Sequence, residues 1–218
     1  MVLKVLVFGH SYVRRLEKFC AENYLQWLNV GLDGTEIQVD FHGIGGGTVC
    51  NGAKSIKNHS QTSILNSNYY DCVFLQMGGN DLSSKNKSTD PCKLAKDIFH
   101  FSNYLFYSFS VKHIIIGQLL SRSKLNCPTG YNDKIHVVNN KIRALTSDVK
   151  HITFWTHRGF WQNPESLICD KDGVHLNGSG MSKYAISVHS AIAITQKMFL
   201  LTFLSKLGKH WPSSESLK

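Results

Sequence analysis

The chain has little proline, no long apolar run and few acidic residues. With 4 prolines and 17 glycines among 218 residues, it is neither a collagen-like nor a linker-like polymer. Hydrophobic residues make up 42% of it, enough for a buried core, which excludes an intrinsically disordered chain. No run reaches eighteen apolar residues, so we expect no integral membrane segment. The first apolar stretch, residues 2–8, is too short for a signal peptide, and we expect a cytoplasmic protein.

The cysteines and histidines show no metal-binding or redox pattern. The 6 cysteines are widely spaced without a C-x-x-C pair, so neither a zinc site nor a thioredoxin-type motif is visible. None of the 11 histidines belongs to an H-E-x-x-H pair. We therefore expect reduced thiols, no metal and no organic cofactor.

The net charge is positive because acids are scarce. Lys and Arg number 24 against 15 Asp and Glu, which gives a formal charge of +9, and no basic block stands out. Such a charge favours a polyanionic partner, either RNA or an anionic membrane surface, without selecting one. Solvated lysines on an ordinary surface explain it equally well.

Short apolar runs rich in Val, Ile and Phe alternate with helix-like stretches. The runs predict five buried strands, over 3–8, 36–41, 72–77, 112–117 and 151–155. The clearest helix begins at Asp90-Pro91, a cap residue followed by proline at the first helical position. Other helices are expected over 131–148 and from 178 to about 204. The apolar segment 199–204 is expected to be buried in the core, and docking on a partner or contact with lipid are the alternatives. This alternation predicts an α/β fold with a parallel sheet covered on both faces.

We predict one domain, residues 1–205, followed by a polar tail, 206–218. In parallel α/β sheets ligands bind beyond the carboxyl ends of the strands, so the residues that follow each strand are the candidates for chemistry.

Strands one and two are each followed by a glycine turn. Ser11 follows Gly9-His10 and opens a helix, where the helix dipole favours a developing negative charge, as a nucleophile requires. The commoner role of such a serine is a helix N-cap. The second turn reads GIGGGT and lacks the Lys-Ser/Thr of a P-loop. Its N–H groups suit an oxyanion hole or a phosphate cradle, and a flexible turn is the alternative.

Strands three and five are followed by the remaining candidates. Asn80, in GGND, offers a neutral amide donor for an oxyanion, although Asn and Gly also favour plain turns. A long loop, 156–176, ends in Asp172-Gly173-Val174-His175, where a carboxylate three residues before a histidine can orient the imidazole. Alone, D-x-x-H is usually a surface accident. Phe160 and Trp161 in this loop line an acyl pocket or form a small loop core.

Each of these signals is weak alone, but all fall in order at strand ends and each supplies a different part of an acyl-transfer site. Together they predict a serine hydrolase.

The four blocks GHS, GIGGGT, GGND and DGVH make the chain resemble the SGNH hydrolases, also called the GDSL esterase/lipase superfamily, over residues 5 to about 185. The resemblance implies a flavodoxin-like three-layer α/β/α sandwich with a five-stranded parallel sheet. It implies a catalytic triad of Ser11, His175 and Asp172. It also implies an oxyanion hole from Ser11, Gly46 and Asn80. Gly45 is the alternative glycine, and Asp170 is the alternative acid.

The chain departs from the SGNH pattern at one position, and it has a closer similarity to one group of proteins. The family usually has Asp where this chain has His10, a change that alters local hydrogen bonding or substrate choice, or falls on a tolerant structural position. The stretches VFGHSYVRRL, IIIGQLLSRS and DGVHLNGSGMSKYA are similar to the esterase domain in the first open reading frame of some vertebrate non-LTR retrotransposons. That similarity implies a module of a longer RNA-associated protein.

The expected function is a serine esterase acting on acetyl, other short-chain acyl or lysophospholipid-like esters. The alternative is an RNA- or lipid-binding module with a vestigial esterase site. A flavodoxin-like cofactor binder would share the fold class, but it leaves D-x-x-H without a role.

Overall fold

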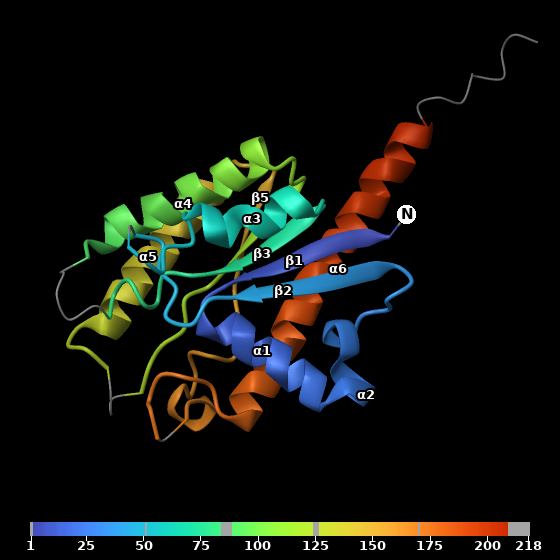
Figure 1. Ribbon diagram of the computed structural model, residues 1–218. Helices are drawn as coiled ribbons and strands as arrows, with labels where there is room; N and C mark the ends of the chain where they lie inside the picture. The colour runs from blue at the N-terminus through green and yellow to red at the C-terminus, as the bar shows by residue number, and fades with distance from the viewer. Residues whose placement is uncertain (1, 51, 84–88, 124–126, 170, 209–218) are drawn as a thin grey trace, which may run out of the picture.

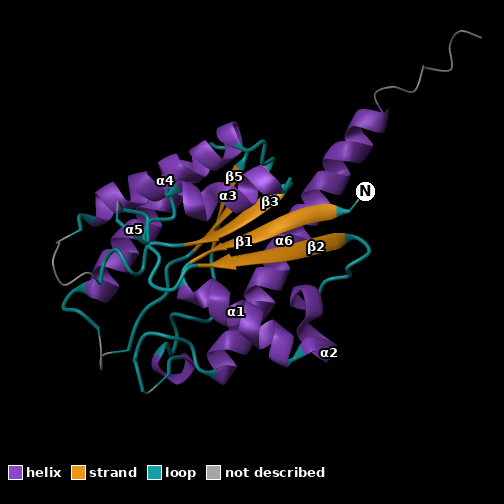
Figure 2. Ribbon diagram, in the orientation of Figure 1, coloured by secondary structure: helices purple, strands orange, loops and turns teal. Residues whose placement is uncertain are grey.

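The computed structural model describes residues 2–50, 52–83, 89–123, 127–169 and 171–208. Its centre is a parallel sheet in the order β2-β1-β3-β4-β5 (Figure 2). This is the flavodoxin-like order, and it confirms the predicted fold class. The strands lie close to the predicted runs: β1 (Leu3–Gly9), β2 (Ile37–Gly43), β3 (Cys72–Gln76), β4 (His113–Gly117) and β5 (Ile152–Trp155).

Helices cover both faces of the sheet, which completes the three layers (Figure 1). One face carries α1 (Ser11–Glu22), the short α2 (Tyr24–Trp27) and α6 (Gly178–Gly208). The other carries α3 (His59–Ser67), α4 (Pro91–Ser108) and α5 (Tyr131–Thr146). Two 3-10 turns, η1 (Leu28–Gly31) and η3 (Glu165–Leu167), lie in the connections.

The central strands are apolar along their whole length because both of their faces are buried. In β1, Val5 and Val7 face the α1 and α6 layer, while Leu6 and Phe8 face the α3, α4 and α5 layer. Side chains of a strand alternate between the two faces, so a continuous apolar run fills two separate cores.

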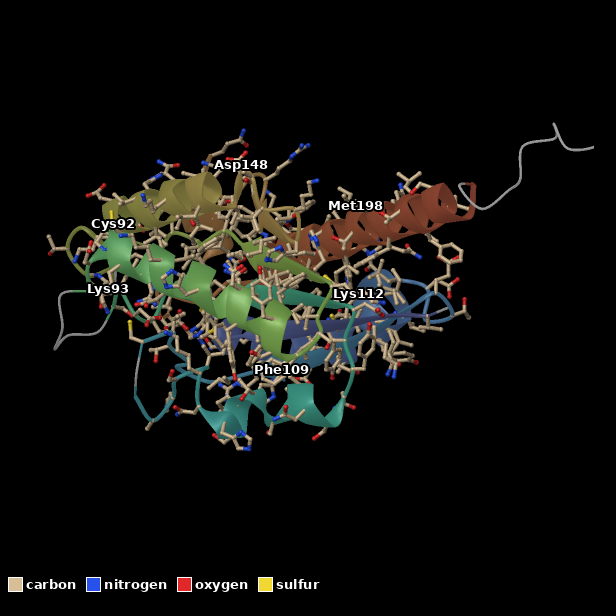
Figure 3. The ribbon with its side chains drawn as sticks, turned by 90° about the horizontal axis from the view of Figure 1, so that it is seen from above. Cys92, Lys93, Phe109, Lys112, Asp148 and Met198 are labelled. Carbon is tan, nitrogen blue, oxygen red and sulfur yellow. The ribbon has the colours of Figure 1, made fainter. Side chains whose placement is uncertain are left out.

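The helix α4 begins where its sequence signals predict. Asp90 accepts hydrogen bonds from the backbone N–H groups of Cys92 and Lys93 at 3.0 and 3.2 Å, which satisfies two donors that the helix itself cannot. Figure 3 labels Cys92 and Lys93 at this end of the helix, and Phe109 beyond the other end. The predicted apolar face is buried: Leu94, Ile98, Phe101 and Leu105.

The helix α6 has two different halves. Its first half, including Tyr184 and Val188, is part of the core. The prediction that 199–204 is buried is wrong. Phe199 still packs against the core, but Leu201 and Phe203 are 68% and 54% exposed. The physical reason is length, because α6 runs past the strands (Figure 1) and Met198 lies on this outer part (Figure 3).

By length and apolar composition alone, one helix in the described part of the chain, over Gly178–Ser205, could cross a membrane. The sequence had predicted no such segment. The helix α6 is long and apolar enough to meet these two criteria, although its first half packs on the sheet. The helix continues to Gly208, past the predicted domain end at 205. The rest of the predicted tail, 209–218, lies outside the described residues.

Candidate active site

The turn after β1 places Ser11 at the start of α1. A Cβ at Gly9 would lie 2.3 Å from the carbonyl oxygen of Gln76 on β3, so only glycine lets β1 pass this close to its neighbour. The N-cap of α1 is His10, whose Nδ1 accepts from the N–H of Tyr12 at 3.3 Å. His10 therefore takes the capping role that Ser11 could have had, and it acts as an uncharged acceptor.

The structure brings together the three residues predicted as a triad. The Oγ of Ser11 lies 3.0 Å from Nε2 of His175, and Nδ1 of His175 lies 2.8 Å from Oδ2 of Asp172. A carboxylate that accepts from Nδ1–H leaves Nε2 as the acceptor for the serine hydroxyl. The arrangement is a hydrogen-bonded relay from an acid through an imidazole to an alcohol.

The carboxylate of Asp172 is fixed by its own loop. Its Oδ1 accepts from the backbone N–H groups of Val174 and His175 at 2.9 and 2.8 Å. Burial acts to raise the pKa of Asp172, but these bonds and the His175 side chain outweigh it and lower the pKa to about 2. The guanidinium of Arg15 lies 3.9 Å away. Asp172 is thus ionised near neutral pH.

Two hydrogen bonds attach this loop to α1 and to the segment after β4. The hydroxyl of Tyr12 donates to the carbonyl of Val174, and the N–H of Ser123 donates to the carbonyl of Gly173 at 2.9 Å. The loop after β5 is therefore tied both to α1 and to the segment after β4, which fixes the imidazole relative to the serine.

Asn80 lies in the same pocket as Ser11. Its amide nitrogen donates to the carbonyl of Gly47 at 2.9 Å, and its amide oxygen faces Nη2 of Arg122 at 3.4 Å. An amide nitrogen carries two hydrogens, and we find no second acceptor for it among the described residues. One N–H of Asn80 therefore remains for a ligand.

The glycine loop reaches this site through Gly47, and neither predicted glycine lines the pocket. Gly46 has a φ of +72° and lies beside Lys54, while Gly45 lies beside Arg14. The oxyanion role of Gly46 stays a prediction. Asp170, the alternative acid, lies outside the described residues.

The pocket is small, and both polar and apolar residues line it. It leaves a volume of about 10 Å³, about the room that one water molecule needs. Burial, with the nearby charges of Arg122 and His175, lowers the pKa of His10 to about 3, so its imidazole is neutral. The lining residues are His10, Ser11, Tyr12, Gln76, Gly79, Asn80, Leu119, Leu120, Arg122, Tyr131 and Val174.

Sequence reasoning missed the residues that follow β4. Leu119, Leu120 and Arg122 line the pocket, and the rule that selects strand ends would have pointed to them. Phe160 and Trp161 do not line it. Phe160 is buried in the core of the α1 and α6 layer, and Trp161 packs on His136 and against the other core, so the two do not form a separate loop core.

The described residues include no cluster of His, Cys, Asp and Glu suited to a metal ion. The six cysteines are free thiols.

The comparisons with known proteins agree on the fold. No protein-family model and no curated protein sequence matches the chain. Among solved structures, a carbohydrate acetylesterase family member from Sinorhizobium meliloti has a TM-score of 0.66 at 14% identity, covering 90% of this chain and 100% of its own. The acetyl xylan esterase AlAXEase has 0.60 at 21%, covering 87% and 100%. A GDSL-like lipase from Bacteroides thetaiotaomicron VPI-5482 has 0.58 at 16%, covering 88% of both chains. At such low identities these likenesses show the fold.

Proposed function

We propose that the protein is a serine esterase that hydrolyses short-chain carboxylic esters. The observation that carries the proposal is the continuous chain of contacts from Asp172 through His175 to Ser11, with distances of 2.8 and 3.0 Å. These three residues lie at the carboxyl end of a parallel sheet, where ligands of such folds bind.

In the proposed reaction, Ser11 Oγ attacks the ester carbonyl carbon and its proton passes to Nε2 of His175. The carbonyl π electrons become the oxyanion of the tetrahedral intermediate. Asp172 holds the imidazole and stabilises its protonated form. Collapse expels the alcohol, which takes the proton from His175. Water, deprotonated by the same imidazole, then releases the acid from the acyl-enzyme.

Three donors are proposed for the oxyanion. The N–H of Ser11 is at the first helical position and has no acceptor within α1. Asn80, which has one N–H free, lines the same pocket. The N–H of Gly46 is the third, proposed from the family resemblance.

Pocket size supports a short acyl group. The volume of about 10 Å³ is that of a single water molecule, so a long acyl chain would need more rearrangement than an acetyl group. Two of the structures similar in fold are named as acetyl esterases, which supports the same choice.

We further propose, from the three sequence stretches given above, that this esterase is a module of a retrotransposon protein. The net charge of +9 is compatible with RNA or an anionic membrane surface as the partner of that module.

Covalent labelling tests the proposed nucleophile. A fluorophosphonate should modify Ser11, and peptide mapping should find the adduct there. Ser11→Ala should abolish both labelling and hydrolysis of p-nitrophenyl acetate, while a buried serine outside the pocket, Ser102, should tolerate Ala without loss of either. Hydrolysis should fall as the acyl chain of the p-nitrophenyl ester lengthens. Full activity in Ser11→Ala would overturn the proposal.

A further inference from the structure

Arg122 is a buried cation in the wall of the proposed active site. Arg122 is only 7% exposed, and it lines the pocket together with Ser11, Asn80 and His10. It stands after β4, the strand whose carboxyl end has no part in the relay of Ser11, His175 and Asp172.

The guanidinium holds Asn80 from the oxygen side. Its Nη2 donates to the carbonyl of Gly79 at 3.3 Å and to Oδ1 of Asn80 at 3.4 Å. On the other side of the amide, Asn80 donates to Gly47. The amide is thus clamped at both ends, in the orientation that leaves one N–H directed away from Gly47. Because guanidinium has donors only, it also excludes the flipped amide.

The charge of Arg122 has no counterion among the described residues. No ion pair joins it to an Asp or Glu there. It rests on the ring of Tyr131, with Cζ 4.4 Å from the ring centroid, a contact that compensates a buried cation only in part. His10, which also lines the pocket, is neutral and supplies no negative charge.

A buried cation without a counterion is costly, and the cost falls when an anion enters. The pocket that would receive the anion is the one that contains the Ser11 nucleophile. In ester hydrolysis two species there carry negative charge, the tetrahedral intermediate and the carboxylate product, whereas the ester is neutral.

We propose that Arg122 makes this pocket an anion site, orienting the Asn80 amide and favouring the oxyanion and the carboxylate product over the neutral ester. The proposal rests on the function proposed above, and it assigns Arg122 as a positioning residue for Asn80 that also provides the site's positive charge. It implies inhibition by the acid that the reaction releases.

Acetate and acetamide are a matched pair of probes, since they share size and planarity and differ in charge. Binding of each to the whole protein is measured by NMR titration, which requires no turnover. Arg122→Met removes charge and donors at similar length, and Arg122→Lys keeps the charge without the planar fork. The control is Arg143→Met, since Arg143 also stacks on an aromatic ring, that of Phe154, but lies outside the pocket.

Wild type should bind acetate more tightly than acetamide. Arg122→Met should weaken acetate binding by about 10- to 100-fold, the range for hydrogen bonds to charged groups, and leave acetamide binding within about twofold. It should lower kcat by a similar factor with little change in KM. Arg122→Lys should retain part of the acetate preference, and Arg143→Met all of it.

Equal loss of acetate and acetamide binding in Arg122→Met, or no loss of either, would overturn the proposal, and so would a wild type that binds both equally. If Arg122→Met unfolds in a thermal melt, Arg122→Lys provides the test. An unchanged preference for acetate over acetamide together with an unchanged kcat in that variant would show that the planar guanidinium group does not matter, which would overturn the positioning role. Failure of the esterase proposal is distinguishable, because then Ser11 resists labelling while the acetate preference can still be measured.

Discussion

The charge states of two side chains define what the site can do near neutral pH. Asp172 is ionised because backbone N–H groups and His175 lower its pKa to about 2, and His10 is neutral because burial lowers its pKa to about 3. Neither group changes charge in the range where esters are assayed. His175 is left as the group whose proton must be absent for Ser11 to be activated.

The pH profile of kcat/KM should therefore have a single acid limb. Activity should rise with pH because the proposed mechanism needs an unprotonated base, with no second limb from Asp172 or His10, and then reach a plateau. Asp172→Asn should lower kcat by up to about 10⁴ and move the acid limb to lower pH, because the imidazolium loses its carboxylate partner. Stopped-flow or initial-rate assays on p-nitrophenyl acetate measure both effects.

Asp170→Asn is the control for this prediction. It changes an acid two positions before Asp172 in the sequence, outside the D-x-x-H pattern, so both the rate and the acid limb should stay as in the wild type. Severe loss in Asp170→Asn with a mild effect of Asp172→Asn would show that the triad acid is misassigned.

At the scale of elements, a buried polar network links β3, β4, β5 and α6 beneath the pocket. His157 lies 3.0 Å from Oε1 of Gln76 and 2.8 Å from Oγ of Ser187, and Tyr184 also donates to Gln76. Burial lowers the pKa of His157 to about 3, so it takes part as a neutral ring. Gln76 lines the pocket, and the network thus supports the pocket floor.

Gly117 makes room for this network, since its Cβ would lie 2.3 Å from Oε1 of Gln76 and 3.1 Å from Nε2 of His157. Gly117→Ala should lower the free energy of unfolding by about 1–3 kcal/mol, the usual cost of overpacking, as measured by urea denaturation. Gly34→Ala is the control, because no atom lies within 4 Å of the added methyl group, and its effect should stay within about 0.5 kcal/mol.

The elements differ in how far the sequence predicts them, and the difference has physical causes. Buried strands and the Asp90 cap follow from local patterns, and both are confirmed. The η1 turn does not follow from a local pattern. Asn29 and Val30 adopt positive φ there, and nothing in the sequence predicts that conformation for a valine. Asn29 supports the turn by donating to Ile37 and accepting from Val39, contacts made only after β2 has formed.

The candidate site is predictable only in part for the same reason. Ser11, Asn80, Asp172 and His175 follow strands and match short motifs, so sequence suffices to select them. Arg122 has no motif, and its place beside Asn80 depends on β3 and β4 lying side by side. The capping by His10 was equally hidden, since histidine is not among the preferred cap residues.

At the scale of the whole molecule, α6 extends beyond what the fold needs. A chain that ends at Phe199 should keep its melting temperature within about 2 °C, because the removed Leu200, Leu201, Phe203 and Leu204 are at least half exposed. Its kcat/KM for p-nitrophenyl acetate should be unchanged. A chain that ends at Ser187 should fail to fold, since it lacks the core residues Val188 and Ile192. Thermal melts of both chains measure the difference.

The 164 positions that separate Ser11 from His175 along the sequence also set an order of events in biosynthesis. A ribosome adds residues from the N-terminus at roughly 5–20 per second, so the nucleophile leaves the exit tunnel well before its base exists. The sheet edges and α1 must wait for the final helix to close their core, and contacts this distant form late in folding. In the proposed function, a nascent chain that lacks His175 therefore carries an inert serine, and catalysis begins only after the core part of α6 has been made and folded.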